Sequence, residues 1–238
     1  MKKIYEIYKD LYKEYGPQGW WPFIEFDTIK RDKTGNDVGY HPLDYSYPKT
    51  KKQRVEIFLG CILTQNTTFT SVIKAMLNLE KLNAIDFDVI KTMDIEKFKE
   101  AIRPAGYFNQ KASYILNFIE FYESLEGRVP RRQELLKVKG IGEETADSIL
   151  LYGYNQVEFK VDAYTKRLYF ALGLIDEKAK YKDVKTLIEN SLEKQNLDKK
   201  EALIVYQEYH ALIVEHCKRY YSKKPYALNC FLKEKYSK

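Results

Sequence analysis

The sequence has few residues of the kinds that build metal sites or disulfide frameworks. Its 238 residues include only three cysteines, Cys61, Cys217 and Cys230. Three thiols cannot complete a disulfide framework, and an odd count suits a reducing compartment. The three histidines also lack metal-motif spacing, which favours structural or surface roles for His41, His210 and His216. We therefore expect no bound metal and a cytoplasmic location.

Long apolar runs are also missing. No stretch of about 18 apolar residues occurs, which excludes a membrane-spanning helix. The first residues have the spacing of an amphipathic helix rather than the apolar stretch of a signal peptide. With 45% apolar and 31% charged residues, the composition is that of an ordinary soluble chain with enough apolar side chains for a core.

Positive charge is concentrated at the C-terminus. Residues 216–238 contain seven Lys or Arg and one Glu, whereas the other 215 residues contain 33 of each sign. Lys223 and Lys224 lie in this tail, which also contains Tyr220, Tyr221 and Tyr226. Such a tail suits a polyanionic partner, and a solvated tail that merely aids solubility is an equal alternative.

Helical apolar spacing continues through almost the whole chain. It predicts helices over residues 2–15, 53–64, 68–82, 94–102, 108–125, 143–154, 163–172, 181–194 and 200–220. No segment alternates as a strand would, so the expected class is all-α with short connections. The polar segment 27–52 is the exception and predicts a long loop, of functional or disordered character.

A glycine-containing corner lies between two predicted helices. Gly140 and Gly142 follow Lys139, and missing side chains let the backbone of such a corner approach another surface closely. The unpaired N–H groups that begin the next helix can bind a phosphate. Taken alone, the corner is as often purely structural.

About twenty residues later, Asp162 follows an apolar, strand-like run and precedes a helix. A carboxylate there is either a simple helix N-cap or a functional group, and one residue can serve both purposes. The two segments together read Val138-Lys-Gly-Ile-Gly-Glu-Glu-Thr-Ala146 and Val161-Asp-Ala-Tyr-Thr-Lys-Arg167. In sequence and spacing they resemble the signature of the helix-hairpin-helix DNA glycosylases, the superfamily of endonuclease III.

Two departures from endonuclease III narrow this resemblance. The position of the family's lyase lysine is Glu144, which cannot form a Schiff base, so the resemblance implies a monofunctional enzyme that uses water. Lys139, Lys160 and Lys166 remain as candidates for a displaced amine. The tail has Cys217 and Cys230 where an iron–sulfur cluster needs four ligands, so we expect no cluster and no other cofactor.

Further blocks resemble the endonuclease-III-like 3-methyladenine DNA glycosylases. They are Tyr15-Gly-Pro-Gln-Gly-Trp-Trp-Pro22, Phe58-Leu-Gly-Cys-Ile-Leu-Thr-Gln-Asn-Thr-Thr-Phe69 and Arg103-Pro-Ala-Gly-Tyr-Phe-Asn-Gln-Lys-Ala112. By this resemblance Trp20, Trp21 and Phe69 hold the extruded base. Aromatic faces suit a cationic alkylated base, although tryptophans often serve only to pack a core. Leu212 replaces a lysine that this branch can carry.

The resemblance implies two helical lobes with an active-site cleft between them. One would be residues 53–155, a helical barrel ending in the hairpin, and the other residues 1–52 with 156–238. A monomer would bind damaged double-stranded DNA through Lys139, Gly140, Gly142, Lys223 and Lys224. Gln65 or Asn66 would fill the space left by the flipped base, or would simply cap a helix. Asp162 would be catalytic.

Three alternatives to an alkylpurine glycosylase stay open at this point. The first is a bifunctional glycosylase and lyase acting on oxidised bases. The second is a glycosylase of the same fold that removes adenine or thymine from mismatches. The third is a non-catalytic helix-hairpin-helix module that only binds DNA.

Overall fold

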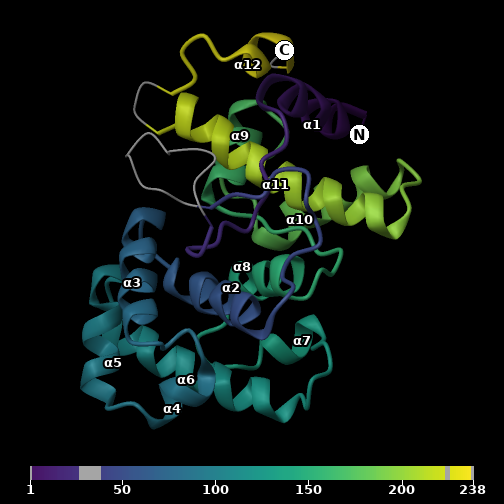
Figure 1. Ribbon diagram of the computed structural model, residues 1–238. Helices are drawn as coiled ribbons and strands as arrows, with labels where there is room; N and C mark the ends of the chain where they lie inside the picture. Colours follow the sequence, from purple (N-terminus) through teal and green to yellow (C-terminus); the bar gives the residue numbers. More distant parts are fainter. Residues whose placement is uncertain (1, 27–38, 223–225, 237–238) are drawn as a thin grey trace. The chain divides into compact units, whose positions relative to one another are not determined.

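The computed structural model describes residues 2–26, 39–222 and 226–236, and these are helical without a β-strand (Figure 1). The contacts divide the chain into two compact units. Residues 21–155 form one, called here the hairpin unit. Residues 1–20 and 156–238 form the other, the aspartate unit. The sequence-based division assigned residues 21–52 to the same part as the N-terminal helix, whereas their contacts group them with residues 53–155.

Long-range contacts explain this grouping. Phe23 and Gly39 form an antiparallel bridge, with N···O distances of 2.9 and 3.2 Å. The Ile24 N–H donates to the Glu56 carboxylate at 2.7 Å. The buried His41 lies 2.8 Å from the Trp21 carbonyl oxygen, and its ring stacks on Phe23 at 5.6 Å. The described ends of the predicted loop are therefore ordered by tertiary contacts, while residues 27–38 lie outside the described ranges.

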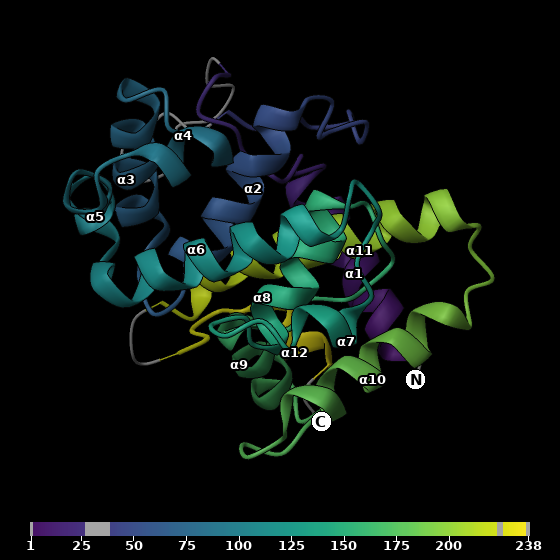
Figure 2. The ribbon, with the colours of Figure 1, turned by 90° about the horizontal axis from the view of Figure 1, so that it is seen from below.

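The hairpin unit is built around α2. Its helices are α2 (Lys51–Leu63), α3 (Phe69–Lys81), α4 (Phe87–Thr92), α5 (Ile95–Ile102), α6 (Phe108–Ser124), α7 (Arg132–Leu135) and α8 (Glu143–Ser148), with a 3₁₀ turn η1 (Arg103–Ala105) and a π-helical turn η2 (Ile149–Gly153). α2 is apolar on nearly all sides, as expected of a central helix. It packs against α3, α6, α8 and η2, and α6 passes beside it in Figure 2.

Aromatic packing fixes the position of α2. The Phe58 ring lies 5.2 Å from Phe118 and 5.2 Å from Tyr154. Gly60 of the same helix lies against Trp21, and a Cβ at this position would lie only 2.6 Å from the ring of Trp21. The glycine thus lets a tryptophan of the preceding segment lie directly against the helix.

The aspartate unit is built around the long helix α11 (Lys199–Tyr220). The other helices are α1 (Lys2–Tyr15), α9 (Ala163–Ala171), α10 (Tyr181–Glu193) and α12 (Phe231–Tyr236). α1 and α9 both pack on α11. The fully buried Tyr209 of α11 donates to the Ile4 carbonyl at 2.9 Å and lies 2.6 Å from the Tyr169 hydroxyl. This hydrogen-bonded core joins three helices of the unit.

The nine helices predicted from apolar spacing are all present within a few residues of the expected bounds, except that the one expected over 143–154 divides into α8 and η2. Three shorter helices, α4, α7 and α12, have too few turns to show a period. Among the described residues, no helix is long and apolar enough to cross a lipid bilayer.

Candidate active site

The helix-hairpin-helix corner joins α7 to α8 in the hairpin unit. Gly140 has a φ of +98°, and a Cβ there would lie 2.1 Å from the Tyr114 ring, so this position requires glycine on both grounds. Asn117 donates to the Lys139 carbonyl at 3.2 Å. Gly142 is exposed and has open space around it, as a backbone surface for another molecule requires. Lys139 is exposed beside it.

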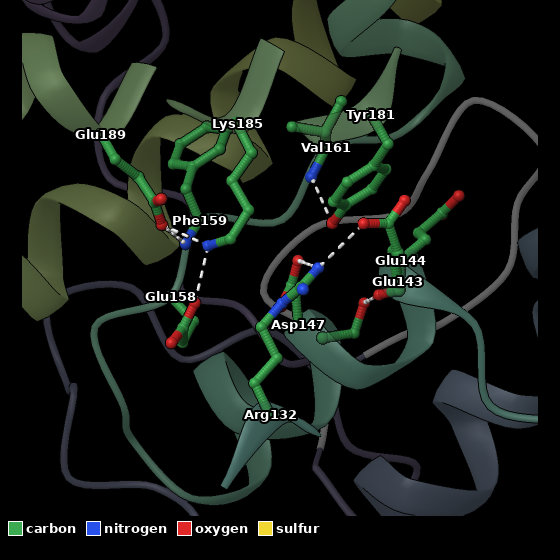
Figure 3. Close-up of polar contacts among 11 residues, drawn as sticks. Arg132, Glu143, Glu144, Asp147, Glu158, Phe159, Val161, Tyr181, Lys185 and Glu189 are labelled. Carbon is green, nitrogen blue, oxygen red and sulfur yellow. Dashed lines mark hydrogen bonds and ion pairs between the residues drawn. The ribbon is translucent and has the colours of Figure 1, made fainter. Parts of the chain in front are cut away.

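A buried ion pair holds the two hairpin helices together (Figure 3). Arg132 of α7 donates to both carboxylate oxygens of Asp147 of α8, at 2.6 and 3.1 Å, and also lies 3.4 Å from Glu143. The Asp147 side chain is fully buried. A two-pronged Arg–carboxylate contact fixes orientation as well as distance. The ion pair therefore fixes the relative orientation of the two helices that the exposed turn connects.

Gln65 and Asn66 follow α2, and their side chains have different surroundings. The Gln65 amide donates to the Gly140 carbonyl at 2.9 Å and to the Thr145 hydroxyl at 3.1 Å, so it supports the hairpin corner from behind. Asn66 is exposed, with a left-handed φ of 51°. Of the two amides predicted to fill the space of a flipped base, Asn66 is the one presented to solvent.

Lys111 of α6 fixes the start of this loop. Its ammonium group donates to the carbonyls of Leu63, at the end of α2, and of Ala105, at the end of η1, at 2.8 and 2.7 Å. Burial lowers the pKa of Lys111 to about 8. A cation at two helix ends also opposes the partial negative charge of their carbonyls. Lys111 lies within the Arg103–Ala112 motif, and the sequence alone predicts no role for it.

The three predicted pocket aromatics are divided between the two units. Trp21 and Phe69 meet edge to face in the hairpin unit, with centroids 5.9 Å apart and planes at 76°. Because they touch each other, no base lies between them in this arrangement. Trp21 is only 5% exposed, whereas Phe69 at the start of α3 is half-buried. Trp21 thus supports Phe69, and Phe69 is the ring that retains exposed surface.

Trp20 belongs to the aspartate unit instead. Its ring meets His210 of α11 edge to face, at 5.3 Å and 85°. The preceding residues are held by Glu208 of the same helix, whose carboxylate accepts the backbone N–H groups of Gln18 and Gly19 at 2.7 and 3.1 Å. Glu208 is 1% exposed. A buried carboxylate with paired backbone donors fixes the segment that leads into Trp20.

Asp162 caps α9 and is also held from α11. One carboxylate oxygen, Oδ1, accepts the Thr165 N–H at 2.7 Å and the Thr165 hydroxyl at 2.9 Å. The other, Oδ2, lies 3.3 Å from Nε2 of His210. Burial would raise the pKa of Asp162, but the hydrogen bond from His210, the charge of Lys160 and the Thr165 N–H outweigh it and hold that pKa below its usual range. The residue is thus both a helix cap and an ionised, oriented carboxylate.

The C-terminal residues of this unit do not fit an iron–sulfur cluster. Cys217 and Cys230 are buried and unbridged, and Cys230 lies 3.2 Å from Nε2 of His216. Two thiols and an imidazole fall short of the four ligands that a cluster takes. Within the described residues, no three potential ligands gather at one point. Lys223 and Lys224 lie outside those residues.

A cavity of about 360 Å³ in the aspartate unit contains none of the predicted site residues. Its lining is Val157, Glu158, Glu189, Leu192, Glu193, Leu197, Ala202 and Tyr206. Lys185 forms ion pairs with Glu158 and Glu189 at its edge (Figure 3). The Lys185 ammonium group therefore balances the charge of these two carboxylates. The residues predicted to form the active site are not among those that line this cavity.

Comparison with known proteins agrees with this geometry. Residues 59–194 match the model of the HhH-GPD superfamily base excision DNA repair proteins, which spans α2 to α10 and includes the hairpin and Asp162. The chain is 39% identical over 242 aligned positions to a protein of Methanocaldococcus jannaschii named "Putative DNA repair glycosylase MJ1434", and the alignment covers 97% of this chain and 94% of that one. The chain belongs to the HhH-GPD superfamily. It is a DNA repair glycosylase.

Other members of the superfamily are similar over most of the chain. Endonuclease III of Sulfolobus acidocaldarius is 32% identical, with 74% of this chain and 78% of that one covered. The 3-methyladenine DNA glycosylase of H. pylori, solved with 1,N6-ethenoadenine, is 25% identical with a TM-score of 0.68, covering 91% and 97%. An endonuclease III–DNA complex has a TM-score of 0.70 at 17% identity, covering 100% and 95%, and shows the shared fold.

The residues that the sequence analysis missed are polar groups buried in apolar helices. Glu208 and His210 of α11 and Lys111 of α6 are each at most 2% exposed, and each binds a segment that carries a predicted site residue. The sequence does contain a signal for these residues, because each is a charged or titratable residue at a position where the helical spacing predicts an apolar one. Such a residue must find partners when it is buried, but its partners are distant in sequence.

Proposed function

We propose that this glycosylase is monofunctional and releases alkylated purines, with 3-methyladenine as the type substrate. The observation that carries the proposal is Asp162, an ionised carboxylate whose two oxygens are both oriented by hydrogen bonds. The sugar develops positive charge as the glycosidic bond breaks, and a fixed carboxylate stabilises that charge. The same group orients or deprotonates the attacking water.

The substrate class is supported by the leaving group and by the aromatic residues. A cationic alkylated purine leaves without protonation by a strong general acid. Phe69, supported by Trp21, offers a stacking surface, and a cationic base gains a cation–π contribution of about 0.5–2 kcal/mol there. The 3-methyladenine glycosylase of H. pylori is among the similar structures. Neutral oxidised lesions gain neither the cation–π contribution nor the activated leaving group.

Water rather than lysine is the proposed nucleophile because Glu144 takes the position of the lyase lysine. Of the candidate displaced amines, Lys166 donates to the Ala179 carbonyl at 3.0 Å and Lys139 lies in the other unit at the hairpin. Lys160 is buried near Asp162, whose pKa its charge lowers. In this role Lys160 supports the charge of the carboxylate.

DNA is the proposed partner, bound as double-stranded DNA containing the damaged base. The exposed hairpin turn at Lys139, Gly140 and Gly142 would bind the backbone, and Asn66 would fill the space left by the extruded base. Extrusion costs a few kcal/mol, which stacking and backbone contacts offset. A solved endonuclease III–DNA complex shares the fold of this chain, which supports DNA as the partner.

The deciding experiment is a panel of duplexes, each with one lesion, assayed under single-turnover conditions. We expect release of 3-methyladenine to exceed release of 8-oxoguanine, thymine glycol, uracil and mismatched bases by orders of magnitude. Borohydride trapping on abasic DNA should give no covalent adduct with the wild-type protein. Faster release of a neutral base contradicts the substrate class, and an efficient adduct contradicts the monofunctional mechanism and indicates Lys160 as the amine to test.

A further inference from the structure

His210 stands out among the buried polar groups of the aspartate unit. It is completely buried on α11, and Nε2 of its ring lies 3.3 Å from Oδ2 of Asp162. The Trp20 ring covers it edge to face at 5.3 Å. A fully buried imidazole needs partners for its polar atoms, and here the partner is the carboxylate proposed to be catalytic.

The protonation state of His210 decides what it does to Asp162. Burial lowers the pKa of His210, the nearby charge of Lys160 lowers it further, and Asp162 opposes both with a smaller effect. The ring is therefore neutral at neutral pH. A neutral imidazole carries one N–H, and a contact with an ionised carboxylate requires that N–H to be on Nε2.

We infer that His210 is a positioning residue for Asp162: its neutral ring donates the Nε2–H to Oδ2 and holds the carboxylate in its working orientation. The inference rests on the proposed role of Asp162. Thr165 of α9 donates only to Oδ1, so it holds the carboxylate from one side. A second donor from another helix removes the remaining rotation about the Cβ–Cγ bond, which matters because a carboxylate must be aligned with the reacting sugar.

Several other groups also act on this carboxylate. Lys160, two residues earlier in the chain, contributes positive charge. Burial raises the pKa values of Tyr164 of α9 and Cys217 of α11, and the charge of Asp162 adds to both shifts. Their neutral forms persist through the working pH range, so protonation of Asp162 controls the acid side of the activity profile.

Three substitutions of His210 separate positioning from packing. His210→Gln keeps an N–H near the place of Nε2, His210→Asn keeps one near the place of Nδ1, and His210→Phe keeps only ring volume. Tyr209→Phe is the matched control, because it breaks buried hydrogen bonds on the same helix without removing the donor to Asp162. Release of 3-methyladenine is measured under single-turnover conditions from pH 4 to 8, together with binding to an abasic duplex.

We expect His210→Phe and His210→Asn to slow base release on the order of 10-fold at neutral pH and to bring the acid limb into the measured range, so that their rates fall as the pH approaches 4. His210→Gln and Tyr209→Phe should keep the flat wild-type profile down to pH 4, and binding to abasic DNA should not change. A flat, wild-type profile in the Phe and Asn variants overturns the inference while leaving the function intact. A wild-type enzyme that releases no alkylated base contradicts the proposed function instead.

A spectroscopic measurement decides the point if the variants fail to fold. In ¹⁵N-labelled wild-type protein, His210 should be a neutral imidazole protonated on Nε2 through neutral pH. In Asp162→Asn this preference should weaken, because the amide no longer requires a donor. A neutral ring protonated on Nδ1, or a tautomer indifferent to the Asn substitution, overturns the inference independently of activity.

Discussion

Glu56 in the hairpin unit and Asp162 in the aspartate unit are both shielded from solvent, but their carboxyl groups have different partners. One oxygen of Glu56 accepts the Ile24 N–H at 2.7 Å, and the other has no hydrogen-bond partner among the residues that the structure describes. Burial raises its pKa to about 8, even though the Ile24 bond opposes the shift. Asp162 has donors at both oxygens, which outweigh its burial and lower its pKa.

This difference shows that burial alone does not decide the charge of a carboxyl group. An unpaired oxygen in a low-dielectric site favours the neutral acid, whereas several oriented donors favour the ion. The hairpin unit therefore has a neutral carboxyl group in its core, and the aspartate unit has an ionised one beside His210. The predictions below test this contrast, beginning with the largest expected effect.

Asp162→Asn should have the greatest effect on activity. The amide can still accept the Thr165 N–H, so the cap of α9 and the fold are kept, but the negative charge opposite the cationic transition state is lost. We expect single-turnover release of 3-methyladenine to fall by roughly 10²–10⁴-fold. Affinity for an abasic duplex is the control and should be unchanged. An Asn variant with near-normal base release means that the charge is not needed.

Arg132→Met should have the greatest effect on stability. It removes the guanidinium partner of the fully buried Asp147 carboxylate, and breaking such a pair costs about 3–5 kcal/mol. Urea unfolding followed by circular dichroism measures the loss. Arg128→Met is the control, because its ion pair with Glu134 is exposed and contributes about 1 kcal/mol or less. Equal losses in the two variants would show that the Arg132 pair is not a special element of the hairpin.

The two units also differ in how far the sequence predicts them. Apolar periodicity locates the long helices, and Asp162 is recognisable from the sequence as the cap of α9, while its catalytic role stays a prediction. The order of residues 39–50 depends on contacts such as His41 with Trp21 and on the Phe23–Gly39 bridge, which leave no local period. Trp20 and Trp21 are adjacent in sequence but belong to separate units, and only tertiary structure reveals that separation.

Glu56→Gln tests the neutral member of the pair. The wild-type carboxyl group titrates near 4.5 when unfolded and near 8 when folded, so its contribution to stability is complete below about pH 4.5 and is lost as the pH rises toward 8. Each pH unit in this window costs up to about 1.4 kcal/mol. The Gln variant should lack this slope and be more stable than wild type at pH 8. Glu96→Gln, at an exposed position, should keep the slope. Parallel curves for wild type and Glu56→Gln from pH 5 to 8 would indicate an ionised Glu56.

Phe69→Ala should have the smallest effect, and it links the hairpin unit to the substrate. Losing a stacking surface for a base costs about 1–3 kcal/mol, or roughly 5- to 150-fold in rate. Because no base is present at an abasic site, affinity for abasic DNA should hardly change, while release of 3-methyladenine slows. Phe170→Ala, at an exposed phenylalanine of α9, is the matched control and should release base at the wild-type rate.

The same experiment distinguishes a stacking ring from a purely structural one. A structural Phe69, packed edge-on against Trp21, would lower thermal stability and slow the release of every lesion by the same factor. A stacking Phe69 slows the cationic base more than a neutral one, because only the cation loses a cation–π contribution together with the dispersion contact. Phe69→Trp, which keeps an aromatic face, should recover most of the rate. A uniform loss across lesions with no recovery by tryptophan would leave the glycosylase without its proposed preference for alkylated bases, and its place in the superfamily would not change.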